Sequence, residues 1–135
     1  MKKILLLLGI FLTSIMLMSC SGSKYYTYEK GLYELYFMSG NFSSSSFEYF
    51  TIELFENGKI IIKIKGKYTM YADEFKAVGK FSIEDEKITV NINIDGEEFT
   101  EVYDYKNGEI HMWNVKDPEN NISFSAKFRR YPLSS

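Results

Sequence analysis

The stretch Ile88-Thr89-Val90-Asn91-Ile92-Asn93-Ile94 alternates a β-branched apolar residue with a polar one. A period of two is typical of a strand with one face buried and one face in water, whereas an amphipathic helix repeats every 3.6 residues. The same alternation recurs outward along the chain, at Ile60, Ile62 and Ile64 and again from Ile122 to Phe128. No segment offers a comparable helical pattern. The sequence therefore predicts an all-β protein.

Asx-Gly pairs punctuate the alternating runs, at Asn57-Gly58, Asp95-Gly96 and Asn107-Gly108. Such pairs favour the type I′ turns that join neighbouring antiparallel strands. Together the two signals predict strands near residues 31–38, 48–56, 59–65, 77–84, 87–94, 97–106, 109–115 and 121–131. The stretch 66–76 fits either a short strand or a loop.

Strands that are joined consecutively by tight turns pair with their sequence neighbours and form an antiparallel meander. Eight such strands have no free edges if they close into an up-and-down barrel. We therefore expect a closed barrel, with an open sheet or a flattened β-sandwich as the alternative. An outer-membrane barrel is not expected, because outward residues such as Lys63, Lys65 and Asn91 would face lipid.

A short motif at the start of the first strand carries a family resemblance. Gly31-Leu32-Tyr33 resembles the Gly-x-Trp motif of lipocalins and related calycins, with Tyr33 in place of Trp. In that family an Arg of the last strand covers the aromatic ring and closes one end of the barrel. The resemblance implies a closing pair of Tyr33 and Arg130, with the adjacent Arg129 as the alternative. The pattern over residues 31–131 resembles the small lipocalin-like lipoproteins of bacteria.

The first twenty residues have the pattern of an export signal. Lys2 and Lys3 are followed by an apolar run over residues 4–18, which is too short for a comfortable membrane span. Leu17-Met18-Ser19-Cys20 resembles the bacterial lipobox, which implies cleavage before Cys20 and acylation of that cysteine, with palmitate as a typical acyl group. We expect a lipoprotein signal peptide at 1–19, the lipidated Cys and a polar tether at 20–30, and a barrel domain at 31–135. A soluble secreted protein is the alternative.

Acylated Cys20 would attach the protein stably to a lipid bilayer, because two or more acyl chains suffice for anchoring. The expected location is the bacterial cell envelope, and Ser21 after the anchor favours the outer membrane if the source is Gram-negative. A net charge of −2 over 135 residues gives no basic surface for nucleic acid.

The sequence offers little for catalysis. His111 is the single histidine, no Gly-x-Ser-x-Gly is present, and most carboxylates fall at predicted turns. The single Cys also leaves too few ligands for a Cys/His zinc site. We expect no enzyme, no cofactor and no metal.

An eight-stranded barrel is just wide enough to be filled by side chains or to hold one small ligand. The inward face is predicted to collect large residues: Tyr33, Leu35, Phe37, Phe50, Ile52, Leu54, Ile60, Ile62, Ile64, Phe81, Ile83, Ile88, Val90, Ile92, Ile94, Phe99, Tyr103, Tyr105, Ile110, Met112, Phe124 and Phe128. Small residues that would open space are few, chiefly Ala77, Gly79 and Ala126. The candidate ligand-pocket residues are the loop-flanking pair Phe42 and Phe47, the polar set Glu101, Tyr103 and Tyr105, and Met112.

Two functions follow as hypotheses. The first is a lipid-anchored envelope protein that binds a small apolar ligand without catalysis. The second is an interaction module with a filled barrel, which contacts an envelope or extracellular protein or a glycan. Its surface would be the outward aromatics Tyr36, Tyr49, Phe55, Tyr68, Tyr71, Trp113 and Tyr131.

Overall fold

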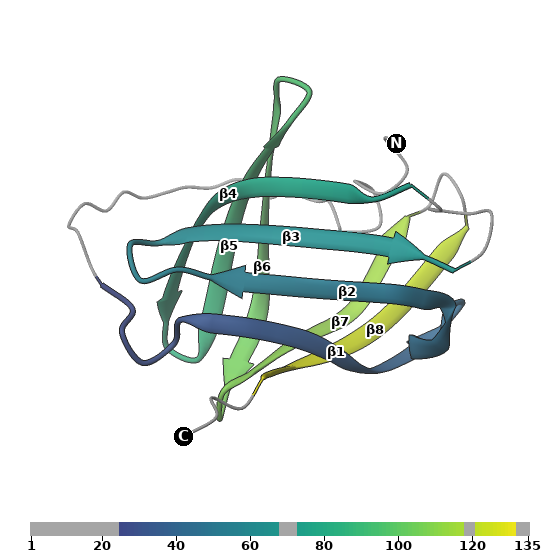
Figure 1. Cartoon of the computed structure of the whole chain (residues 1–135), viewed down its shortest axis with the longest axis horizontal. Coiled ribbons are helices and arrows are strands. Elements are labelled where there is room, and N and C mark those ends of the chain that lie inside the picture. The colour runs from purple at the N-terminus through teal and green to yellow at the C-terminus, as the bar shows by residue number, and fades with distance from the viewer. Residues whose placement is uncertain (1–24, 68–72, 118–120, 132–135) are drawn as a thin grey trace.

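The protein is an eight-stranded antiparallel up-and-down β-barrel in a computed structural model that describes residues 25–67, 73–117 and 121–131 (Figure 1). Each strand pairs with the next in the chain, and β8 returns to pair with β1 from Tyr33↔Arg130 to Gly40↔Phe124. That last pairing closes the barrel, so the prediction of a closed meander is confirmed and the open sheet and sandwich are excluded. The elements are β1 (Gly31–Gly40), the 3-10 turn η1 (Ser44–Ser46), β2 (Phe47–Leu54), β3 (Lys59–Gly66), β4 (Phe75–Glu84), β5 (Lys87–Ile94), β6 (Glu97–Lys106), β7 (Glu109–Asp117) and β8 (Ile122–Arg130).

The predicted strand positions agree with the structure to within about two residues, which is the usual uncertainty of strand ends. In the undecided stretch 66–76, Gly66 ends β3 and Phe75 begins β4. Residues 68–72 lie outside the described part of the chain, and with them the outward candidates Tyr68 and Tyr71.

The hairpin turns follow the predicted chemistry at two of the three Asx-Gly pairs. Asp95 and Gly96 have φ of 53° and 86°, and Asn107 and Gly108 have φ of 53° and 75°, as a type I′ turn requires. At Asn57-Gly58 only the glycine has a positive φ, 93°, and its N–H bonds the carbonyl of Phe55 at 3.0 Å, so this turn is not type I′.

Nearly all the predicted inward side chains do point into the barrel and pack together. The largest that are almost fully buried are Tyr33, Ile52, Leu54, Ile60, Ile62, Ile88, Ile110, Met112 and Phe128. Phenylalanine rings form a connected row through this interior, with centroids 5.4 Å apart for Phe47 and Phe50 and 5.0 Å apart for Phe50 and Phe128. Such contacts add roughly 0.5–1.5 kcal/mol each to the stabilisation from burial.

The prediction for Phe37 is wrong, because its side chain is 43 % exposed on the outside of the barrel. The β1–β8 register shifts between Leu35 and Phe37, so Tyr36 is an extra residue in a β-bulge. Beyond the bulge the alternation is inverted, and Met38 takes the inward position that the pattern assigned to Phe37.

The small size of Gly79 suggested that it would open space in the barrel, but its surroundings show a different role. A Cβ built at Gly79 would lie 2.1 Å from the backbone oxygen of Asn91 on the paired strand. The glycine therefore allows the β4 and β5 backbones to approach closely. Ala77 and Ala126, the other small inward residues, are buried within the packing.

The two ends of the barrel differ in how they are covered. At one end, which we call the closed end, residues 25–30 run across the start of β1 and the β2–β3 and β4–β5 turns. Tyr26 is buried there: its N–H bonds the carbonyl of Glu56 at 2.8 Å, and its hydroxyl accepts from the N–H of Ile83 at 3.2 Å. The part of the expected tether from Tyr26 onward thus packs as part of the barrel.

At the other end, which we call the open end, the β5–β6 hairpin projects beyond its neighbours (Figure 1). β6 and β7 pair only near the closed end, at Asp104↔His111, Tyr105↔Ile110 and Lys106↔Glu109. The first part of β6 therefore pairs with β5 alone along its described length. At the open end, the inward face of β6 therefore lies on a strand that is paired on one side only, with β5.

Candidate functional site

The closed end is sealed by the Tyr33–Arg130 pair. The Arg130 guanidinium carbon lies 5.9 Å from the centre of the Tyr33 ring, and its Nη1 donates to the carbonyls of Tyr28 and, at 3.1 Å, Lys30. Arg129 points outward instead and lies 4.2 Å from the Tyr36 ring centre. The geometry therefore selects Arg130 over Arg129 as the closing residue, through a cation–π contact and two carbonyl bonds.

Gly31 is required beside this pair for both space and conformation. Its φ is +144°, and a Cβ at this position would lie 2.7 Å from Cδ of Arg130. A side chain there would displace the guanidinium that covers Tyr33.

Tyr105, a candidate for the ligand pocket, also belongs to the closed end. The hydroxyls of Tyr33 and Tyr105 are 2.8 Å apart, and the Tyr33 hydroxyl donates to the carbonyl of Glu29 at 2.6 Å. Burial and the bond with Tyr105 raise the pKa of Tyr33, so its phenol stays protonated. Along β6, Tyr105 is about 13 Å from Glu101, so the two polar candidates serve opposite ends.

Phe42 and Phe47, the loop-flanking pair among the pocket candidates, lie on either side of a turn that is tied to the barrel at the open end. Phe42 is half-buried with its ring centre 5.8 Å from Phe47 and 6.3 Å from Phe124, and Phe47 is buried. The loop backbone is held from β8, because Asn41 N–H bonds the carbonyl of Ser123 at 3.0 Å. The two rings thus form one apolar side of the open end.

Glu101 and Tyr103 lie on β6, on the inward face. In the β5–β6 register Glu101 is opposite Val90 and Tyr103 is opposite Ile88, and both of these partners are buried. Burial raises the pKa of Glu101 to about 8, and burial together with the nearby Glu101 carboxylate raises that of Tyr103. A carboxyl whose pKa is raised by burial is frequent at functional sites.

Phe99 extends this surface toward the tip of the hairpin and was not among the predicted site residues. It lies opposite Ile92 and is only partly buried against the core. Its two-residue spacing from Glu101 was the signal that could have placed it in the set. Met112, by contrast, is fully buried opposite Ala126, so it packs in the core rather than lining a surface.

Two hollows lie on the outside of the barrel. One, of about 480 Å³, is lined by Tyr25, Phe55, Glu56 and Asn57 at the closed end. The other, of about 430 Å³, lies over the outer face of β1, β2 and β3 and is lined by Leu32, Tyr49, Thr51, Glu53, Ile61, Lys63 and Glu74. Neither contains a candidate pocket residue.

His111 lies on the outer wall in a hydrogen-bonded group. Its Nε2 is 2.8 Å from Oε1 of Glu109, and the hydroxyl of Tyr36 donates to the same oxygen at 2.6 Å. The bond from His111, followed by that from Tyr36, lowers the pKa of Glu109. Over the described ranges no three His, Cys, Asp or Glu side chains come close enough together to hold a metal ion.

The Glu101 carboxyl should make stability fall as pH rises. Its pKa rises from 4.5 to about 8 on folding, so its contribution is complete below about pH 4.5 and is lost toward pH 8. Because water partly screens this carboxyl, we expect the loss to be about 1–2 kcal/mol. Urea unfolding of wild type and Glu101→Gln between pH 5 and 9 measures it: the wild-type curve should fall below that of the variant as pH rises. The exposed control Glu98→Gln should give a curve parallel to that of the wild type. A parallel curve for Glu101→Gln would contradict the prediction.

An eight-stranded antiparallel barrel sealed at one end by an aromatic–arginine pair is consistent with a lipocalin-like fold. In comparisons with known proteins, no family model matches the chain and no curated protein shows significant similarity to it. In the part of the chain that the structure describes, no helix has the length and apolar character needed to cross a bilayer.

Proposed function

We propose that this protein is a lipid-anchored lipoprotein of the bacterial envelope, related to the lipocalin-like lipoproteins, whose open barrel end binds a small apolar ligand without catalysis. The observation that carries the proposal is the position of Glu101 on the inward face of β6, opposite the buried Val90, where partial burial raises its pKa to about 8.

The open end combines the two kinds of contact that such a ligand needs. Phe42 and Phe99 are half-buried aromatic side chains that a hydrocarbon chain could cover. Near neutral pH the protonated carboxyl of Glu101 can both donate and accept a hydrogen bond from a polar head. Tyr103 supplies a second hydroxyl on the same face of β6.

Native mass spectrometry of the full acylated chain, released from detergent micelles, tests ligand binding. We expect a small apolar molecule, such as a fatty acid, to be retained at pH 7. The apparent affinity should fall by about tenfold per pH unit above pH 8 if only the neutral carboxyl binds it. Glu101→Gln should remove that pH dependence, and the exposed control Glu98→Gln should keep it. A chain that carries no ligand at any pH would sink the proposal.

Acylation of Cys20 is tested by Cys20→Ala. Without the thiol no lipid can be attached and the signal segment should not be cleaved. We expect unprocessed or released protein in place of the mature membrane-bound form, measured by membrane fractionation and by the intact mass. Unchanged processing and membrane retention of Cys20→Ala would refute the anchor.

The interaction module remains the second candidate, and a specific observation favours it. Trp113 is 50 % exposed on the outer wall, yet three neighbouring side chains hold its ring in place. A fixed and exposed aromatic residue is typical of a contact surface.

A further inference from the structure

Large aromatic residues are exposed on both strands beside β8, and each of these strands has a register shift. The bulge of β1 turns Phe37 outward, and β7 has a second register shift between Met112 and Val115, where Asn114 has a φ of 51°. Phe37 is 43 % exposed and Trp113 is 50 % exposed. The β1 bulge turns Phe37 outward, whereas Trp113 is outward by ordinary alternation with the buried Met112, so two large rings lie exposed on either side of β8.

Lys127 joins these two rings into one surface. Its Nζ lies 5.3 Å from the centre of the Phe37 ring and 5.5 Å from that of Trp113. The Trp113 Nε1 also donates to Oδ2 of Asp104 at 2.9 Å, and the His111 ring lies edge-on to the Trp113 ring at 5.5 Å. Since these contacts already fix the rings, little conformational entropy is lost when a partner covers them.

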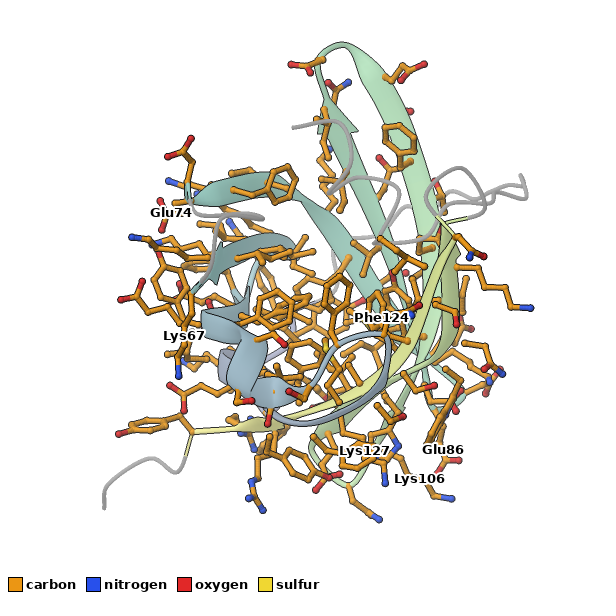
Figure 2. The ribbon with its side chains drawn as sticks, turned by 90° about the vertical axis from the view of Figure 1, so that its right-hand side faces the viewer. Lys67, Glu74, Glu86, Lys106, Phe124 and Lys127 are labelled. Atoms are coloured by element: carbon orange, nitrogen blue, oxygen red, sulfur yellow. The ribbon has the colours of Figure 1, made fainter. Side chains whose placement is uncertain are left out.

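β8 supplies the cations beside the two rings. β8 has no acidic residue, and its outer side presents Lys127 and Arg129. Figure 2 shows Lys127 pointing away from the barrel, while Phe124 of the same strand points into it. With the exposed Tyr131 after β8, we name this surface the aromatic–basic face, defined by Phe37, Trp113, Lys127, Arg129 and Tyr131.

The nearby acids are mostly engaged with partners of their own. Asp104 accepts from Lys87 at 2.6 Å as well as from Trp113, and these bonds lower its pKa. Glu109 accepts from Tyr36 and His111. Glu34 is the exposed acid across from Arg129 on β1. The five residues of the face therefore carry two positive charges, Lys127 and Arg129, and the acids Glu34, Asp104 and Glu109 lie around them.

The tether sets how far the barrel can move from a bilayer. Cys20 precedes Tyr25, the first described residue, by only five positions, a span of at most about 18 Å. Tyr26 is then packed against the closed end, beside the segment whose carbonyls bind Arg130. An anchored barrel thus stays against the membrane surface, and β8 ends close to the point where the tether joins the barrel.

We propose that the aromatic–basic face lies on the anionic headgroup surface of the bilayer that holds Cys20. Trp, Tyr and Phe favour the membrane interface, and Lys and Arg are attracted to anionic lipid by about fivefold in partitioning per side chain. Phe37, Trp113 and Tyr131 enter the interface, and Lys127 and Arg129 contact the phosphates. This inference rests on the lipid anchoring that we propose above.

Trp113 is the single tryptophan of the chain, so its fluorescence reports on this face directly. The experiment uses the full acylated chain in vesicles of phosphatidylcholine and phosphatidylglycerol, with lipids brominated near the top of their acyl chains as quenchers. We expect brominated lipids to quench Trp113 and aqueous iodide to quench it poorly. Quenching by lipid should weaken without phosphatidylglycerol or at high salt, because the attraction is electrostatic.

Charge reversal tests the basic part of the face. Lys127→Glu and Arg129→Glu should each shift the balance toward undocked barrels by at least about fivefold, seen as lower lipid quenching of Trp113. Lys80→Glu is the matched control, because Lys80 is exposed on β4, four strands away from β8 around the barrel. Thermal unfolding of each variant measures whether the fold is kept, and we expect a cooperative transition for all three.

Two outcomes would overturn the inference. Trp113 quenched by iodide and not by brominated lipid would mean that the face is in water. Trp113 shielded from both quenchers would mean that a protein or a glycan covers it. The intact mass of the same preparation reports acylation of Cys20, so a missing anchor is recognised separately from an undocked face.

Discussion

Replacing Tyr33 by Ala is expected to lower the free energy of unfolding by about 4 kcal/mol, the usual cost of deleting a buried aromatic ring. Tyr33 is fully buried, and its hydroxyl bonds Glu29 and Tyr105. Arg130→Ala should cost about 2 kcal/mol, because it frees the carbonyls of Tyr28 and Lys30 and uncovers the ring. Since both changes remove the same cation–π contact, the double variant should lose about 1–2 kcal/mol less than the two single losses together.

Urea unfolding followed by circular dichroism measures the four free energies of this cycle. Arg129→Ala is the matched control, because that guanidinium stacks on Tyr36 outside the barrel and does not touch Tyr33. Its loss should therefore add to that of Tyr33→Ala. If the losses of Tyr33→Ala and Arg130→Ala were also additive, the pair would not act as one closing unit.

The closing pair was accessible from the sequence because it depends on features that a sequence displays. Gly31 marks the start of β1, strand alternation places Tyr33 inward, and Arg130 follows Phe128 on the same face. Only the choice between Arg129 and Arg130 needed coordinates. The barrel itself followed from alternation and turn chemistry, since consecutive hairpins leave few other topologies.

Trp113 and Tyr131 were predicted to point outward, but the outward position of Phe37 was not. A bulge shifts the strand register by one residue, and the sequence around Tyr36 and Asn114 contains no pattern that predicts a bulge. Phe37 was therefore assigned to the wrong side, and its meeting with Lys127 and Trp113 could not be foreseen. The type I′ turn at Asp85 and Glu86 was hidden for a related reason, because both residues adopt a positive φ without a glycine.

The open end was only partly predictable because β6 serves both ends of the barrel. Alternation puts Glu101, Tyr103 and Tyr105 on one face, as observed, but it gives no position along the barrel axis. The pairing with β7 supplies that position, and it places Tyr105 beside Ile110 at the closed end. Similarly, the polar composition of the tether concealed the burial of Tyr26 against Phe81, with ring centres 4.7 Å apart.

Gly79→Val is expected to lower the free energy of unfolding by about 3 kcal/mol or more, which is severe for an overpacking change. The first side-chain atom would lie 2.1 Å from the backbone oxygen of Asn91, and a strand backbone cannot move aside as a flexible side chain can. The Gly79↔Ile92 pair must therefore separate. Since β5 is the strand against which β6 pairs at the open end, the support of Glu101 should loosen as well.

Thermal unfolding and amide hydrogen exchange of β4 and β5 measure this effect. Exchange at the β4–β5 ladder should rise more than exchange at the β1–β8 ladder, because the clash is local. Ser82→Val is the matched control: the same strand gains a β-branched residue at an exposed site opposite Thr89, where strand propensity favours it. Wild-type stability in Gly79→Val would show that the close approach of β4 and β5 is not required. The glycine would then be free to serve the interior, as its small size first suggested.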